Sequence, residues 1–228
     1  SIVSQEIFIH SNLVEIIISD NASTDLTNIE VPLYVLRFPD KIKYFRNEED
    51  LKDLNFEKCL SYAKGKFLKL NNDTLLHHSF SLLFLLSAIL ENIDEKHVLF
   101  FANQQLHNKP IFTDCNLDKF LELTGYISTW VGSFGIWKSD FHQIPEFNRY
   151  SKYQLVQFDN TLNQIATKGH FKVYSKIFGN TIGVRAKGGY DLITVFLDNT
   201  SYILEEYVSC GNLKNHSVIN FKRKVIFE

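Results

Sequence analysis

Residues Glu15–Asp25 read EIIISDNASTD, so a hydrophobic segment runs directly into acids and small polar residues. We expect a strand over 13–19 and a turn into a helix after it. One interpretation of the turn is a helix cap, made by Asn21 or Ser23. The other is that Asp20 holds a polar ligand at the carboxyl end of the strand. By itself, the turn favours the cap.

A second polar cluster follows another strand, in the stretch Lys64–Leu76 (KGKFLKLNNDTLL). Asp73 is the only acid among the polar residues that end this strand. A carboxylate and the oxygens of a diphosphate can together hold a hard divalent cation. The alternative, which this cluster alone slightly favours, is a plain strand-to-helix turn rich in Asn and Asp.

Strands and helices alternate along the first half of the chain. Further strands are expected at 42–46, 66–70 and 97–102, and helices at 55–64 and 77–92. This alternation predicts a parallel, doubly wound α/β sheet, in which ligands bind at the carboxyl ends of the strands. The pattern in the second half predicts a helix at 154–168, a strand at 171–175 and helices within 191–211 and 215–227.

The composition excludes several classes of protein. The 228 residues carry 24 basic and 26 acidic side chains and a net charge of −2, so we expect no nucleic-acid partner. The three cysteines lie far apart without a CxxC pair, which fits a reducing, cytoplasmic compartment. The longest apolar stretch, Ser81–Leu90, is too short to span a bilayer.

The two polar clusters, in this order and at this spacing, indicate a particular family more specifically than either cluster alone. VEIIISDNASTD, followed about 50 residues later by KFLKLNNDTLL, resembles the family-2 inverting glycosyltransferases with the GT-A fold. The resemblance covers 1–90 and is diffuse beyond. SIVSQ, at residues 1–5, resembles the tail of the family's first helix, so the family's first strand and its base-contacting loop are expected to precede Ser1.

The resemblance implies a fold and a division of the chain. The fold is a GT-A-like, doubly wound and mostly parallel α/β sheet, Rossmann-like, with a helical C-terminal extension. The catalytic domain would span 1–190, with a nucleotide-binding half over about 1–100 and an acceptor half over about 101–190. The extension would span 191–228 and pack on the domain.

The resemblance also implies roles in a donor site. Asp20 matches the acid that contacts the nucleobase, with Asn21 beside it. Asn71 and Asn72 match the ribose side of the family's DxD motif, and Asp73 matches the acid that holds Mn²⁺ or Mg²⁺ against the diphosphate. Asn71 departs from the usual Asp and brings no charge.

Transfer with inversion needs a carboxylate that takes the proton of the acceptor hydroxyl. Asp159, in QLVQFDNTL, is the candidate catalytic base, with Asp140 and Glu146 as weaker candidates and a surface-facing acid as the alternative. Trp130 and Trp137 are candidates for stacking on sugar rings, although large aromatics are more often core residues.

Two further stretches bear on the donor site. Arg185 and Lys187, in RAKGGYD, suit a flap over the diphosphate, and a plain connector is about equally expected. His77 and His78 follow the second polar cluster and could lie near a metal, but adjacent histidines in such a connection are more often polar surface residues.

The function implied is transfer of a sugar from a nucleoside-diphosphate sugar to a growing bacterial surface glycan: lipopolysaccharide, lipooligosaccharide or capsule. The acceptor would be a glycan or a lipid-linked glycan, and a homodimer and a peripheral membrane contact are further expectations. The segment 212–228 combines basic and apolar residues and suits either that contact or packing on the domain. The alternatives are a non-catalytic nucleotide- or glycan-binding module and a sugar-1-phosphate nucleotidyltransferase.

Overall fold

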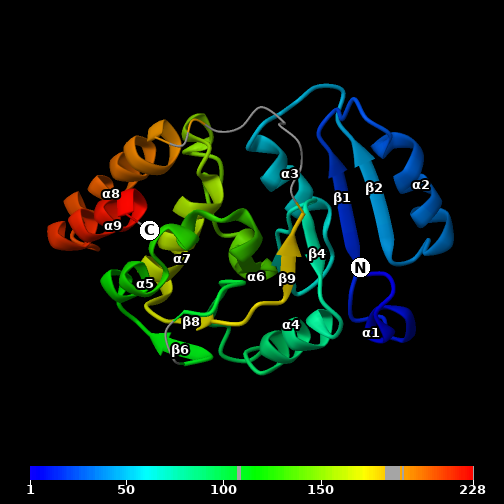
Figure 1. Ribbon diagram of the computed structural model, residues 1–228, viewed down its shortest axis with the longest axis horizontal. Helices are drawn as coiled ribbons and strands as arrows, with labels where there is room; N and C mark the ends of the chain where they lie inside the picture. Colours follow the sequence, from blue (N-terminus) through cyan, green and yellow to red (C-terminus); the bar gives the residue numbers. More distant parts are fainter. Residues whose placement is uncertain (107–108, 183–190, 192, 228) are drawn as a thin grey trace.

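The structure is a computed structural model that describes residues 1–106, 109–182, 191 and 193–227. It is a mixed α/β protein in which short strands are surrounded by helices (Figure 1). The first half contains, in chain order, α1 (Glu6–His10), β1 (Ile16–Asp20), α2 (Thr27–Arg37), β2 (Ile42–Arg46), α3 (Leu54–Tyr62), β3 (Phe67–Lys69), β4 (Leu75–His77), α4 (Ser81–Leu90) and β5 (Val98–Phe101).

The second half contains fewer strands and more helical turns. It consists of β6 (Ile111–Asp114), α5 (Leu117–Thr124), η1 (Gly125–Thr129), η2 (Val131–Ser133), β7 (Gly135–Trp137), α6 (Lys138–Phe141), η3 (Ser151–Tyr153), α7 (Val156–Lys168), β8 (Phe171–Tyr174), β9 (Gly179–Thr181), η4 (Thr194–Asn199), α8 (Thr200–Ser209) and α9 (Asn215–Phe227). Within the described residues, no helix is both long and apolar enough to cross a membrane.

The strands pair in four small groups. β1 pairs with β2 and β5 with β8, both in parallel. β3 pairs with β7, β4 with β9 and β6 with β8, all antiparallel. Three of the five pairings among the described residues are therefore antiparallel, and the expectation of a mostly parallel sheet is wrong for this part of the chain. The α/β class itself is confirmed.

The antiparallel pairs join segments that are far apart in sequence. β4 meets β9 about a hundred residues later, with Leu75 opposite Thr181. The helix expected at 77–92 begins only at Ser81, because Phe80 before it has a left-handed backbone with φ of 65°. His77 therefore ends a strand instead of opening a helix.

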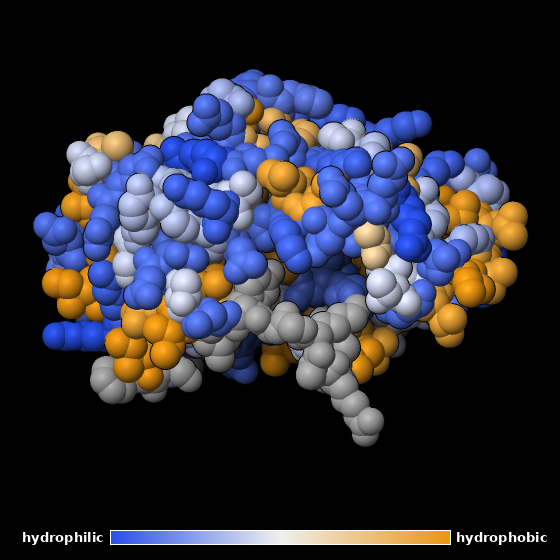
Figure 2. Space-filling model, turned by 90° about the horizontal axis from the view of Figure 1, so that it is seen from above, coloured by the Kyte–Doolittle hydropathy of each residue, from blue (hydrophilic) through white to orange (hydrophobic). Residues whose placement is uncertain are grey.

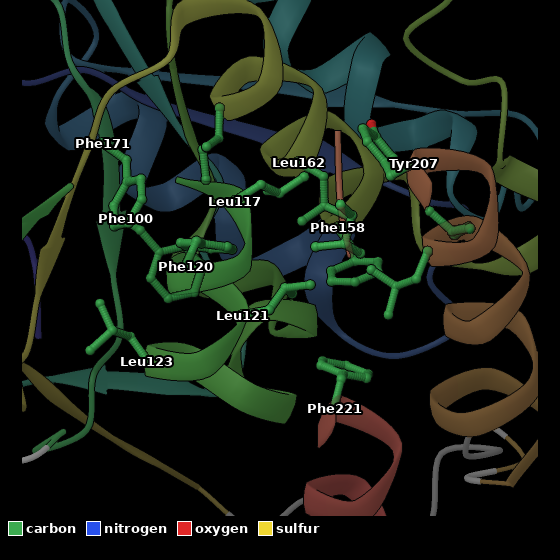
Figure 3. Packing of buried hydrophobic residues seen from close by; sticks show 14 of the residues in the cluster. Phe100, Leu117, Phe120, Leu121, Leu123, Phe158, Leu162, Phe171, Tyr207 and Phe221 are labelled. Carbon is green, nitrogen blue, oxygen red and sulfur yellow. The ribbon is translucent and has the colours of Figure 1, made fainter. Parts of the chain in front are cut away.

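The largest cluster of buried side chains joins the second half to the C-terminal helices (Figure 3). Phe158 and Leu162 are one helical turn apart on α7 and are both fully buried. Tyr207 from α8 and Phe221 from α9 pack into the same cluster, at 5% and 2% exposure. The apolar side of α9 thus faces the protein core. Of the two expectations for the segment 212–228, a membrane contact and packing on the domain, the structure shows the packing.

Candidate functional site

The ends of β1 and β3 define the candidate donor site. Glu15 precedes β1, and its Oε1 atom accepts the backbone N–H of Gly65 at 2.7 Å, just before β3. Both strands line one cavity of about 280 Å³, together with Asn71. β1 ends at Asp20, and Asn71 lies two residues beyond the end of β3. Since the two strands begin together and flank the same cavity, we infer that these two ends lie at one edge. Figure 2 shows the molecule from the side toward which β1 points, and the middle of this surface is hollowed with hydrophilic walls.

The cavity between β1 and β3 does not itself suit a diphosphate. Its walls are mostly aliphatic, with Ile16 and Ile17 on one side and Leu68, Leu70 and Leu85 on the others. Charged ligands lose solvation in such surroundings without a matching gain. We therefore place the candidate donor site at the polar turns that follow the strands.

Asp20 lies at the centre of the first turn. Its side chain has no exposed surface, and it accepts hydrogen bonds from the Ser23 N–H (2.8 Å), the Tyr44 hydroxyl (2.6 Å) and Arg46 Nη1 (3.0 Å). Burial raises the pKa of Asp20, but the bonds from Ser23 and Tyr44 and the charge of Arg46 outweigh it, so the pKa is lowered. Asp20 thus holds the turn and the half-exposed Arg46 in place, and its contact with a nucleobase stays a prediction.

Asn21 fixes the opposite side of the same turn. Its Oδ1 accepts the Leu51 N–H at 2.9 Å and the Asn47 side-chain N–H at 3.1 Å, while its own amide donates to Asp50. The residue is thus a bridge between the β1 turn and the segment that follows β2. The sequence suggested two roles for Asn21, capping a helix and binding a ligand. The hydrogen bonds of Asn21 in this structure serve neither role directly.

The second turn is organised by a buried histidine. Asn71 Oδ1 lies 2.9 Å from His77 Nε2, and His77 Nδ1 lies 3.0 Å from Ser81 Oγ. An amide oxygen only accepts, so Nε2 carries the proton and Nδ1 accepts from the serine. Ser81 Oγ in turn accepts from Gln5 Nε2 at 2.9 Å. This chain ties the turn to α4 and to the N-terminal segment.

The expectation that both adjacent histidines are surface residues is wrong for His77, which is 7% exposed, and right for His78. Burial, followed by the charges of Lys69, the N-terminus and His78, lowers the pKa of His77 to about 4. His77 is therefore neutral near pH 7. One feature of the sequence indicates this burial: residues 75 and 77 alternate with 76 along a strand, which puts Leu75 and His77 on the same, buried side.

Lys69, at the end of β3, was not singled out from the sequence. Its ammonium donates to the carbonyls of Gly132 (2.6 Å) and Leu70 (3.1 Å), and it lies 5.2 Å from the centre of the Phe178 ring. Burial lowers the pKa of Lys69 to about 7. Near pH 7 this amine is therefore only partly protonated, so it adds at most a partial positive charge two residues before Asn71.

The 71–73 turn offers a limited set of oxygen ligands for a divalent cation. Asp73 is exposed, and Asn72 Oδ1 is buried without a hydrogen-bond partner among the described residues. Asn71 Oδ1 is already engaged by His77. No group of three His, Cys, Asp or Glu side chains in the described part of the chain is arranged to hold a metal. One carboxylate and one amide oxygen fit a cation, such as Mg²⁺, that takes its other ligands from water and phosphates.

The two tryptophans have different environments. Trp137 is 1% exposed and donates its indole N–H to the His97 carbonyl at 2.8 Å, so it is a core residue and the expectation that it binds sugar is wrong. Trp130 is partly exposed and lies over Gly132, where any Cβ would fall 2.5 Å from its ring. Gly132 therefore leaves space for the indole of Trp130, which keeps a free surface.

Asp159 lies in a buried ion pair. It is 2% exposed, and both of its oxygens are engaged by Arg149, at 2.7 Å to Nε and 2.6 Å to Nη2. The Tyr207 hydroxyl donates to Asp159 Oδ1 at 2.9 Å. Asp159 is therefore not a surface-facing acid. Both of its oxygens are engaged in this structure, and its role as the catalytic base stays a prediction. Of the weaker candidates, Asp140 pairs with Lys168 and Glu146 is exposed.

The partners of Asp159 respond to the same contacts. Hydrogen bonds to Asp159 raise the pKa of Arg149, and burial with the nearby Asp159 charge raises the pKa of Tyr207. The proposed flap residues Arg185 and Lys187 lie outside the described residues.

Comparison with known proteins shows a likeness of fold. No model of a protein family and no curated protein matches the chain. Among solved structures, it is similar to S. aureus TarS 1–349 in complex with UDP-GlcNAc, with a TM-score of 0.57 and 13% identity, over 93% of this chain and 62% of that one. The chain shares the fold of TarS. It spans less than two thirds of the length of that protein, and at this identity the likeness establishes the fold alone.

Proposed function

We propose that this chain is a glycosyltransferase that moves a sugar from a nucleoside-diphosphate sugar to a hydroxyl of a bacterial surface glycan. The observation that supports this most is the position of the Asp20 and Asn71–Asp73 turns. Both follow strands at one edge of a fold shared with a protein bound to UDP-GlcNAc. Ligands of open α/β sheets bind at this kind of edge.

In the proposed site, each turn has its own task. Arg46, held by Asp20, and the amide of Asn71, held by His77, present N–H donors to the nucleotide. Asp73 and Asn72 would hold Mn²⁺ or Mg²⁺, which stabilises the charge of the departing diphosphate when bound. Lys69 adds positive charge two residues before Asn71 when it is protonated, and Trp130 offers a ring face to a sugar.

The finer parts of the proposal rest on the sequence resemblance. They are inversion at the anomeric carbon, a lipopolysaccharide, lipooligosaccharide or capsule acceptor, and action at the cytoplasmic face of the membrane. The acid that would serve as base is left unassigned, because Asp159 is engaged by Arg149.

One observation favours a second candidate function, a non-catalytic module that binds a nucleotide or glycan on the same fold. The acid at the position expected for the base is closed within an ion pair, and Asn71 replaces a charged ligand. Such a module would bind nucleotide without turning over a donor sugar.

Calorimetric titration with UDP, GDP, CDP and dTDP, each with and without Mn²⁺, tests the donor site. We expect one nucleotide to bind with manganese and Asp73→Asn to weaken this binding, while Asp94→Asn, at another exposed acid, leaves it unchanged. Lack of binding to any of the four would refute the donor site. Release of free sugar or transfer from the matching donor then separates the transferase from the binding module.

A further inference from the structure

A second cavity lies on the side of α7 that faces the segment 140–149. Its volume is about 530 Å³, which is within the range of small-molecule sites. Asp159 and Asn160 line it near the start of α7, and Lys168 lines it at the end. None of the residues assigned to the nucleotide lines this cavity, so it is separate from the candidate donor site.

Four of the five strongly charged groups of this cavity are paired with each other, and the fifth, the exposed Glu146, is an acid. Arg149 is bound to Asp159 at 2.6 Å, and Lys168 is paired with Asp140. A phosphate or other anion would have to compete with these carboxylates for its cations. The cavity therefore suits a ligand without net charge.

Amide side chains supply much of the remaining polar surface. Gln143, Asn160, Asn163 and Gln164 all line the cavity. An amide both donates and accepts hydrogen bonds, as the hydroxyl groups of a saccharide do. Ile144 and Pro145 add an apolar wall, against which the C–H face of a sugar ring can pack.

Gln164 gives the most specific indication of a ligand. It is 5% exposed, its Nε2 makes only a long bond of 3.4 Å to the Gly135 carbonyl, and its Oε1 has no partner among the described residues. Buried polar atoms are rarely left without a partner, so this acceptor calls for a donor from a water molecule or a ligand. A ligand hydroxyl meets that need.

We propose that this cavity is a saccharide-binding subsite for a neutral sugar of a glycan. Its role as a holder of the acceptor, away from the reacting hydroxyl, rests on the proposed transferase function. Binding of saccharide does not rest on it, and can be measured without a nucleotide.

The chain offers a matched pair of variants for the test. Gln157 is on the same helix, is 6% exposed, donates to the Thr129 carbonyl and also has an unpartnered Oε1, but it does not line this cavity. The full chain is titrated with N-acetylglucosamine, galactose and lactose, with inorganic phosphate as the anion probe, and binding is followed by NMR chemical shifts. We expect Gln164→Met to weaken saccharide binding about tenfold and Gln157→Met to leave it unchanged.

Asn163→Ala, at a partly exposed position on the rim, repeats the test without touching the core, and should weaken binding severalfold. The proposal is overturned if no saccharide binds, if the two glutamine variants behave alike, if phosphate binds in place of sugar, or if UDP displaces the sugar. Saccharide binding that persists in Asp73→Asn, which disables the donor site, separates a failure of this proposal from a failure of the proposed function.

Discussion

Asp20 and Asp159 occupy two similar clusters in different parts of the molecule. Each is a buried carboxylate bound by one arginine and one tyrosine, Arg46 and Tyr44 in one case and Arg149 and Tyr207 in the other. The partners of Asp20 lie on the neighbouring strand, within 26 residues of it. Those of Asp159 include Tyr207, 48 residues away on α8.

The same chemistry therefore serves two purposes. The Asp20 cluster shapes one turn at the candidate donor site and leaves Arg46 39% exposed at its edge. The Asp159 cluster connects α7 to the C-terminal helices, and its arginine binds the carboxylate through two atoms. A carboxylate at the expected position of a base is thus used to hold the fold together. The predictions below test this difference, from the largest effect to the smallest.

Asp159→Asn should give the largest loss of stability. Removing one charge of a buried pair leaves Arg149 without its bidentate partner, and we expect the free energy of unfolding to fall by about 3 kcal/mol. Urea denaturation followed by circular dichroism measures this. Glu206→Gln is the control, because Glu206 contacts the same arginine from a more exposed position. If both variants lost the same free energy of unfolding, Asp159 would not be the main partner of Arg149.

Asp20→Asn should cost less, about 2 kcal/mol at neutral pH, because Arg46 stays partly solvated. The pKa of Asp20 is lowered in the folded state, so its contribution is complete above the unfolded value of about 4 and is lost as the pH falls through the lowered folded value. The difference in stability between wild type and variant should thus be constant from about pH 6 to pH 8 and shrink in acid. If the stability difference between wild type and Asp20→Asn grew in acid, the pKa of Asp20 would not be lowered by folding.

The tyrosines separate the two clusters energetically. Tyr207→Phe and Tyr44→Phe should each cost about 1 kcal/mol in unfolding experiments. Combined with Asp159→Asn, Tyr207→Phe should show a coupling above about 0.5 kcal/mol, whereas Tyr44→Phe should be additive. Coupling of Tyr44 to Asp159 would mean that the clusters are not independent.

Asn71→Asp extends the comparison to the second turn of the candidate donor site, with little change in overall stability. The new carboxylate would face His77 Nε2, where an amide oxygen lies at 2.9 Å, and should raise the pKa of His77 by about 1–3 units. An NMR titration of the histidine ring protons measures this. If the pKa of His77 stays near 4, the contact between the two side chains does not exist in solution.

The sequence predicted what depends on local pattern. The helix around Phe158 and Leu162 and the strand before Asp20 were expected to within a few residues, because apolar periodicity encodes them. It did not reveal contacts between distant segments, such as the β4–β9 pair. The same limit applies to side chains. Nothing near Asp159 indicates that Arg149 and Tyr207 would enclose it, and Trp137 could not be distinguished from Trp130.

The most direct test of this division of roles is a nucleotide titration of Asp20→Asn and Asp159→Asn. It uses whichever of UDP, GDP, CDP and dTDP binds the wild type best, with Mn²⁺, at a temperature at which circular dichroism shows both variants folded. If Asp20 shapes the donor site and Asp159 holds the C-terminal helices, Asp20→Asn should weaken binding by about tenfold or more, and Asp159→Asn by less than about threefold. The reverse order, or equal losses, would contradict the assignment.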